Sequence, residues 1–201
     1  MTMTTQTKTK KTATRSNSVS VRKEEYNLPD KPFVFEVLSL VSKQRTVSKK
    51  IEILKKYEDP SLKSILIWNF DDSVISVLPP GEVPYSSTNE QTSYSGTLSE
   101  KINDAVSKMD EINTNSLGSS DQGRSSIREE YKMFYNFIKG GNDTLSSLRR
   151  ETMFINILEG LHPKEAEILV LVKDKKLQDK YKITKDNVSS AFPDIKWGGR
   201  S

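Results

Sequence analysis

The sequence contains no cysteine and a single histidine, His162. The missing thiols exclude disulfides, thiolate nucleophiles, iron–sulfur clusters and cysteine zinc sites. His162 is the one candidate base for a serine–histidine triad, but it precedes Pro163 at an expected helix start, where capping or loop packing is its simplest role. Glycine-rich phosphate loops and the Gly-x-Ser-x-Gly elbow are missing too. We therefore expect no enzymatic activity, no metal and no cofactor.

Long apolar runs are also missing. No stretch approaches the roughly 20 residues that cross a bilayer, and the basic N-terminus is not followed by the apolar core of a secretory signal. These absences predict a protein that stays inside the cell that makes it. Only 34% of the residues are hydrophobic, which predicts one ordered core and sizeable polar segments.

The net charge of +4 is unevenly distributed along the chain. Residues 1–22 contain five basic side chains and no acidic one, so residues 23–201 sum to −1. The five are Lys8, Lys10, Lys11, Arg15 and Arg22. We expect this segment to be a disordered tail that either makes weak contacts with nucleic acid or is simply solvated. The nearly neutral remainder argues against a nucleic-acid footprint spread over the folded surface.

Residues 23–85 are expected to form an N-terminal helical unit followed by a proline-rich strap. Helices are predicted from Pro32 to about Arg45, from a Thr46 cap to Tyr57, and from the Asp59 cap to Asp71. Val47, Ile51 and Leu54 are the expected apolar side of the second helix, and its lysines at 49, 50, 55 and 56 read as a solvated face. The adjacent Asp71 and Asp72 fit a helix end better than a Mg²⁺ site. The prolines of 78–85 should block helices and strand ladders alike.

Residues 86–124 read as a flexible insert with one amphipathic helix at 97–112. Thr97 and Glu100 have the spacing of a capping box. Five apolar residues follow at helical spacing and form one stripe: Leu98, Ile102, Ala105, Met109 and Ile112. Because such a stripe is costly in water, it must either fold back on the domain or dock into a partner. The stripe is the candidate partner-binding site.

Residues 125–195 are expected to form a C-terminal helical unit, with a loose end at 196–201. Helices are predicted from Ser126 to Ile138, from about Leu145 to Glu159 as the central helix, from Pro163 to Lys173, and from Thr184 to Ala191. An arginine pair in the central helix, at 149–150, is expected to join a salt-bridge network rather than bind phosphate. The lysine-rich stretch 173–185 is interpreted as a solvated loop, with nucleic-acid contact as the alternative. Taken together, these sequence patterns predict an all-α domain of six to seven helices.

Several short strings carry a family resemblance. They are Arg150–Ile155, Leu158–Glu167, Leu78–Gly81, Pro84–Tyr85, Phe137–Ile138, Gly140–Asn142 and Ala191–Pro193. Together they resemble an uncharacterised family, a domain of unknown function, of T4-like tailed bacteriophages, notably of marine and cyanobacterial hosts. The likeness covers roughly residues 33–195. It implies a viral source and a host cytoplasm as the setting, and it supplies no activity and no site.

The leading functional hypothesis from the sequence is a non-catalytic bacteriophage accessory protein that binds another macromolecule, a host or phage protein. A structural or assembly component of the virion is one alternative. A nucleic-acid-binding protein that uses the basic tail is another. No membrane association and no small-molecule substrate are inferred.

Overall fold

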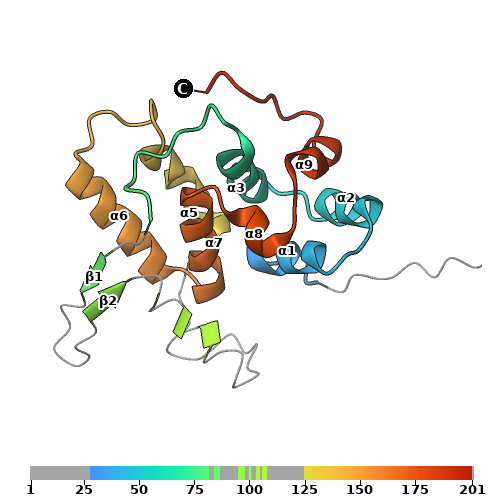
Figure 1. Ribbon diagram of the computed structural model, residues 1–201, viewed down its shortest axis with the longest axis horizontal. Helices are drawn as coiled ribbons and strands as arrows, with labels where there is room; N and C mark the ends of the chain where they lie inside the picture. The colour runs from blue at the N-terminus through green and yellow to red at the C-terminus, as the bar shows by residue number, and fades with distance from the viewer. Residues whose placement is uncertain are drawn as a thin grey trace, which may run out of the picture.

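The computed structural model describes residues 28–81, 84–86, 95–97, 100, 103–104, 106–107 and 125–200. Over these ranges the chain is mostly helical, which confirms the predicted all-α class (Figure 1). The described part holds eight named α-helices and one 3-10 helix, more than the six to seven expected. The excess has two causes: a short helix lies inside the supposed basic loop, and the helix from Ser126 is split in two.

The three N-terminal helices begin where the sequence predicts. They are α1 (Val34–Ser42), α2 (Val47–Lys56) and α3 (Pro60–Phe70). The Asp59 carboxylate caps α3 by accepting a hydrogen bond from the backbone N–H of Ser61 at 2.8 Å. The prediction of which residues form the apolar side of α2 was partly wrong. Leu54 is buried and Ile51 is partly buried, as predicted, but Val47 is 56% exposed and Ile53 is buried in its place, because α2 packs between α1 and α9 (Lys185–Ala191).

The helix expected from Ser126 to Ile138 is only one α-helical turn, α5 (Ile127–Glu130), followed by the 3-10 helix η1 (Tyr131–Phe137). The predicted capping box is present, because Glu129 accepts a hydrogen bond from the Ser126 N–H at 3.0 Å. A 3-10 helix has three residues per turn, so side chains three apart lie in one row. In η1 this aligns Phe134 and Phe137, and both are buried in the core.

The central helix is α7 (Pro163–Lys173) rather than α6 (Ser147–Gly160). α7 contacts α1, α3, α6 and α8 (Leu177–Tyr181), whereas α6 lies at one end of the molecule in Figure 1. Phe154 and Leu158 of α6 are buried, but Leu148 is 75% exposed. Although apolar residues cover much of the circumference of α6, the helix is therefore not buried on all sides.

The C-terminal end is not loose as predicted. Trp197 packs against the core, and the backbone N–H of Gly198 donates to the Asp71 carboxylate at 3.0 Å. Arg200 forms an ion pair with the same carboxylate. The segment is therefore fixed to the end of α3 as far as Arg200.

The proline strap is held from α7 and then leads into a strand. The buried ammonium of Lys173 donates to the carbonyls of Pro79 and Gly81 at 2.9 and 3.0 Å. A two-stranded antiparallel ribbon follows, β1 (Pro84–Ser86) with β2 (Ser95–Thr97). Strand pairing was predicted to be blocked here. It is possible because Pro84 is the first residue of β1, a position that proline tolerates.

One hydrophobic core joins both halves of the sequence. Its largest fully buried side chains include Leu38 and Leu66 from the first half and Phe137, Phe154 and Phe192 from the second. The N- and C-terminal helical units expected from the sequence are thus not separate in space. None of the helices in the described ranges has the length and apolar character that crossing a membrane requires.

Candidate functional site

The stripe predicted to bind a partner lies outside the described residues, as do the five basic residues of the tail. This holds for Leu98, Ile102, Ala105, Met109 and Ile112, and for Lys8, Lys10, Lys11, Arg15 and Arg22. Two described neighbours of the stripe are informative. Thr97 and Glu100 make the expected reciprocal hydrogen bonds, at 2.9 and 3.2 Å, and Val106 packs against the core. Docking of the stripe into a partner stays a prediction.

His162 caps α7, as the sequence suggests. Its Nδ1 accepts a hydrogen bond from the Lys164 N–H at 3.2 Å, and its ring stacks on Phe35 at 4.8 Å between centroids. Burial, assisted by the charge of Lys164, lowers the pKa of His162 to about 4. The imidazole is therefore neutral at physiological pH and is committed to the start of a helix.

The buried carboxylate of Glu165 joins three helix starts. One oxygen accepts the backbone N–H of Val34 in α1 and the other accepts that of Ile127 in α5, each at 2.7 Å. Glu165 itself lies in the first turn of α7, so three positive dipole ends converge on one carboxyl group. Burial raises the pKa of Glu165 to about 7, although the two N–H groups and Arg128 oppose the rise. The group therefore holds the starts of α1 and α5 against α7.

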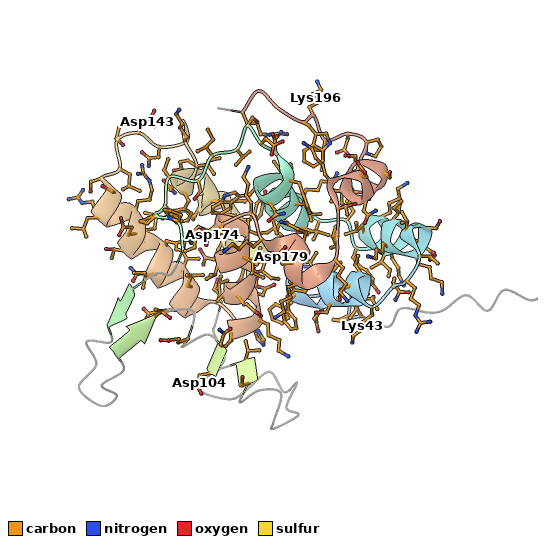
Figure 2. All side chains as sticks on the ribbon, in the orientation of Figure 1. Lys43, Asp104, Asp143, Asp174, Asp179 and Lys196 are labelled. Atoms are coloured by element: carbon orange, nitrogen blue, oxygen red, sulfur yellow. The ribbon has the colours of Figure 1, made fainter. Side chains whose placement is uncertain are left out.

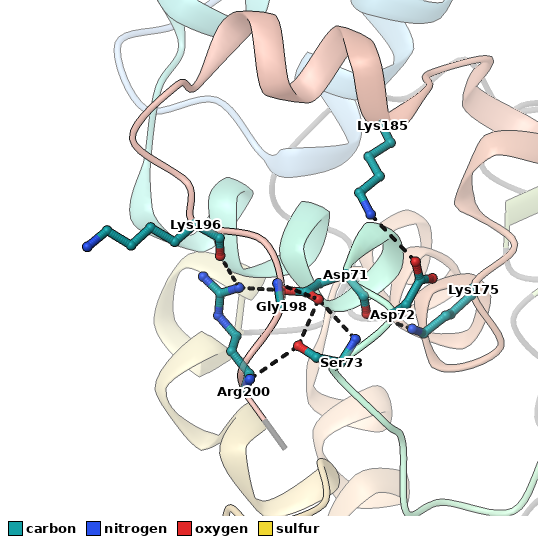
Figure 3. Close-up of polar contacts among 8 residues, drawn as sticks. All are labelled: Asp71, Asp72, Ser73, Lys175, Lys185, Lys196, Gly198 and Arg200. Carbon is teal, nitrogen blue, oxygen red and sulfur yellow. Dashed lines mark hydrogen bonds and ion pairs between the residues drawn. The ribbon is translucent and has the colours of Figure 1, made fainter.

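Asp71 is the centre of a second polar cluster, shown in Figure 3. Its carboxylate accepts from the Ser73 hydroxyl at 2.8 Å and from the Gly198 N–H at 3.0 Å, and it pairs with Arg200. Burial alone would raise the pKa of Asp71, but these donors outweigh it and hold the pKa near 2. The backbone carbonyl of Asp71 accepts from Lys175 at 2.7 Å.

The neighbouring Asp72 points to a different partner. Its carboxylate is exposed and lies 3.5 Å from Lys185 Nζ, while the Asp71 carboxylate faces Ser73 and the C-terminal segment (Figure 3). The two carboxylates therefore do not converge on a common point. No cluster of three or more histidine and acidic residues suited to a metal occurs among the residues that the structure describes.

The basic stretch 173–185 is not the solvated loop that was predicted. It contains α8, and four of its lysines hold other parts of the chain: Lys173 binds the strap, Lys175 binds Asp71, Lys180 pairs with Glu167, and Lys185 pairs with Asp72. Local sequence could not reveal these partners, because most of them are far away along the chain.

The structure brings two lysine-rich stretches of the sequence together. Lys50 of α2 donates to the backbone carbonyl of Lys182, at the end of α8, at 2.6 Å, and α2 packs along α9. Figure 2 labels Lys43 at the corner between α1 and α2. We call the resulting surface the basic face, and none of its nine basic residues is buried. They are Lys43, Arg45, Lys49, Lys50, Lys55, Lys56, Lys180, Lys182 and Lys185.

Basic residues outnumber acidic ones on the basic face, although Glu167 pairs with Lys180 and Asp72 with Lys185. Between residues 43 and 56 six side chains are basic and one, Glu52, is acidic. Between residues 180 and 186 three are basic and one, Asp186, is acidic. A folded body with a total charge near zero thus carries a local concentration of positive charge. The sequence does not reveal this concentration of charge, because each stretch by itself is typical of a solvated surface.

The arginine pair of α6 was predicted to join a salt-bridge network, but neither arginine forms an ion pair with another residue in the described ranges. Arg150 donates to the carbonyls of Asn136 and Asn142, at 2.7 and 2.8 Å, and so fixes the loop that precedes α6. Arg149 lines an open groove of about 540 Å³ between η1 and α6, together with Met133 and Leu148. This groove lies at the opposite end of the molecule from α2 (Figure 1).

Comparisons with known proteins identify one family. Residues 37–109 and 100–179 match a family described as Family of unknown function (DUF6433). No curated protein and no solved structure matches the chain. The two matched ranges together span most of the chain and nearly all of the helical core, from α1 to α8. The chain therefore belongs to the DUF6433 family of unknown function.

Proposed function

We propose that this protein is a non-catalytic accessory protein that acts by binding another macromolecule, and that this macromolecule is a nucleic acid. The observation that supports it is the contact between Lys50 and the carbonyl of Lys182, which unites two lysine-rich stretches separated by more than a hundred residues. A protein partner, docked on the stripe at 98–112, is the alternative outcome.

The chemistry of the basic face suits a phosphate backbone. Ammonium groups spread along a helix and an adjacent helix corner match the regular charge of a nucleic acid and displace its counterions. Charge remains accessible on this surface, since the side chains of Lys55 and Lys182 are exposed. Eight of its nine basic residues are lysines, which carry no planar fork for reading base edges, and only Arg45 does, so the contact is expected to depend little on sequence.

Charge reversal on the full-length protein tests the proposal. In Lys55→Glu/Lys182→Glu, affinity for a labelled DNA single strand and for its duplex should fall by about tenfold or more, because two phosphate contacts become repulsive. Fluorescence anisotropy at low salt measures this. The matched control is Lys139→Glu/Arg149→Glu, which makes the same charge change at exposed sites away from the face and should change affinity by less than about threefold.

The basic tail needs its own control in the full chain. A variant in which Lys8, Lys10, Lys11, Arg15 and Arg22 become Gln should keep most of the binding. The proposal is contradicted if this variant abolishes binding while the reversed basic face leaves it intact. Binding of neither DNA form by the wild-type protein contradicts it as well.

We further propose a bacteriophage source and a host-cytoplasm setting, supported by the strings that resemble the T4-like phage family. Genes for head and tail proteins should flank the gene in its genome. Mass spectrometry should find the protein in infected-cell lysate and not at a fixed copy number in purified virions. Fixed stoichiometry in virions would favour the structural alternative.

A further inference from the structure

A pocket of about 320 Å³ lies between α3 and η1 and has aromatic walls. Its size is at the lower end of the range for small-ligand sites. Two rows of the 3-10 helix form one wall, since Tyr131 and Phe134 lie three residues apart, as do Lys132 and Tyr135. Ser64, Ile67 and Trp68, on one side of α3, form the other.

Trp68 has an unsatisfied polar group beside this pocket. The side chain is 3% exposed, and its Nε1 is one of two buried side-chain polar atoms without a hydrogen-bond partner among the described residues. The indole N–H is enclosed together with the ring, which packs against Phe134 and Phe137. The aromatic surface of Trp68, rather than its N–H, is therefore what this wall offers a ligand.

Two cationic side chains, Lys132 and Arg200, line the pocket. Arg200 uses Nη1 for the Asp71 carboxylate, and the next residue, Asp72, lies 3.5 Å from Lys185 of the basic face. Figure 3 shows the turn at 71–73 between Arg200 and Lys185, with one aspartate facing each of them.

We propose that this pocket binds a nucleobase, with its phosphate against Lys132 and Arg200. A base is flat enough to stack on Tyr135, which is 49% exposed, in a pocket whose other wall includes Trp68. The inference rests on the proposed function, and deepens it: the preferred partner is a single strand, whose bases are free to leave the stack, rather than a duplex.

Tryptophan emission reports directly on the pocket. The protein has two tryptophans, so Trp197→Phe leaves Trp68 as the one reporter. Deoxyadenosine monophosphate and an oligodeoxyadenosine strand should quench this emission saturably, while inorganic phosphate alone should not. The duplex of the same strand should quench it far less, because its bases stay stacked.

Tyr135 supplies the matched variants. Tyr135→Ala should weaken single-strand binding by roughly 5- to 100-fold, the loss of one stacked base, and remove the quenching. Tyr135→Phe should retain both, and Leu148→Ala, exposed on α6, should change neither. Thermal melts establish that the variants remain folded.

The outcomes separate this inference from the proposed function. A strand that binds without changing Trp68 emission and without sensitivity to Tyr135→Ala overturns the pocket and leaves the basic face standing. If no strand binds, the proposed function fails. If the mononucleotide nevertheless quenches Trp68 emission saturably, and Tyr135→Ala removes this quenching, the pocket is a site for free nucleotides. If the mononucleotide does not quench the emission either, the pocket proposal is overturned too.

Discussion

Glu165 is the residue on which three separated helices depend. Its two oxygens accept the N–H groups that begin α1 and α5, from a position in the first turn of α7. Removing the carboxyl group leaves both donors buried and unpaired, at a cost of roughly 1–3 kcal/mol each. Local sequence explains only why a glutamate is favourable in the first turn of a helix, because the two partners of Glu165 are 131 and 38 residues away.

The raised pKa of Glu165 predicts how stability changes with pH. The folded carboxyl retains its proton up to about pH 7, whereas the ordinary value is 4.5. Its protonation therefore stabilises the fold fully below pH 4.5, and this contribution is lost as the pH rises through 7. Glu165→Gln, which stays neutral, should show a smaller fall in unfolding free energy between pH 5 and pH 8 than wild type.

Urea denaturation at several pH values measures that difference. His162 must be considered in the same window, because its lowered pKa contributes stability above 6.5 that is lost as the pH falls toward 4. Comparing the wild type with Glu165→Gln cancels the histidine term, since both proteins keep His162. Identical pH profiles for the two proteins would contradict the account.

Lys182 is the left-handed residue that ends α8. Its φ of 51° is a conformation that costs a side chain about 1–2 kcal/mol and costs glycine nothing. Lys182→Gly should raise the free energy of unfolding by about 0.5–1 kcal/mol after the greater entropy of glycine in the unfolded chain is subtracted. Lys182→Ala should not raise the free energy of unfolding. Chemical denaturation of both variants measures the difference.

Lys175 also has a left-handed backbone conformation and serves as the comparison for Lys182. Its φ is 55°, but its ammonium donates to the Asp71 carbonyl at 2.7 Å. Lys175→Gly relieves strain and loses this bond, so its net gain should be smaller than that of Lys182→Gly. Equal gains would mean that the bond to Asp71 contributes nothing.

At the scale of elements, α6 shows why an apolar helix need not be central. Phe154→Ala should cost about 3–5 kcal/mol because the side chain is 1% exposed. Leu148→Ala, at 75% exposure, should change stability by less than about 0.5 kcal/mol. Urea melts that gave similar costs at both positions would contradict the observed orientation of α6.

Sequence patterns predicted the elements whose signals are local. The caps at Asp59 and Thr184 fixed the starts of α3 and α9, because a cap involves residues two or three apart. Thr46 occupies the predicted cap position of α2, although its side chain makes no capping hydrogen bond. The change from α5 to η1 was missed, since the same apolar spacing fits both helix types. The attachment of Arg200 to Asp71 was missed because it joins residues 129 apart.

The candidate site was the least predictable part for the same reason. Each lysine-rich stretch was visible in the sequence, and each reads by itself as a solvated face. Only the packing of α2 against α9, with Lys50 at the carbonyl of Lys182, makes them one surface. The aromatic pocket likewise depends on α3 meeting η1, which no spacing within either helix indicates.

The whole molecule combines a charge near zero over residues 23–201 with a cluster of basic residues on α2 and around the end of α8. Since residues 23–201 sum to −1, a basic face implies that other surfaces are correspondingly acidic. Such a charge distribution orients the basic face toward a polyanion, and the opposite side of the protein then has no contact with the polyanion. The α6 end, with its open groove, is then turned away from the bound strand.

The salt dependence of DNA binding tests the central claim most directly. Anisotropy titrations of the full-length protein with a single strand should give a slope of log affinity against log salt of about −3 or steeper. In Lys55→Glu/Lys182→Glu the slope should become shallower by about 1–2 units, since each phosphate contact contributes close to one unit. A slope near zero, or one that the basic-face variant leaves unchanged while the tail variant removes it, would contradict the account.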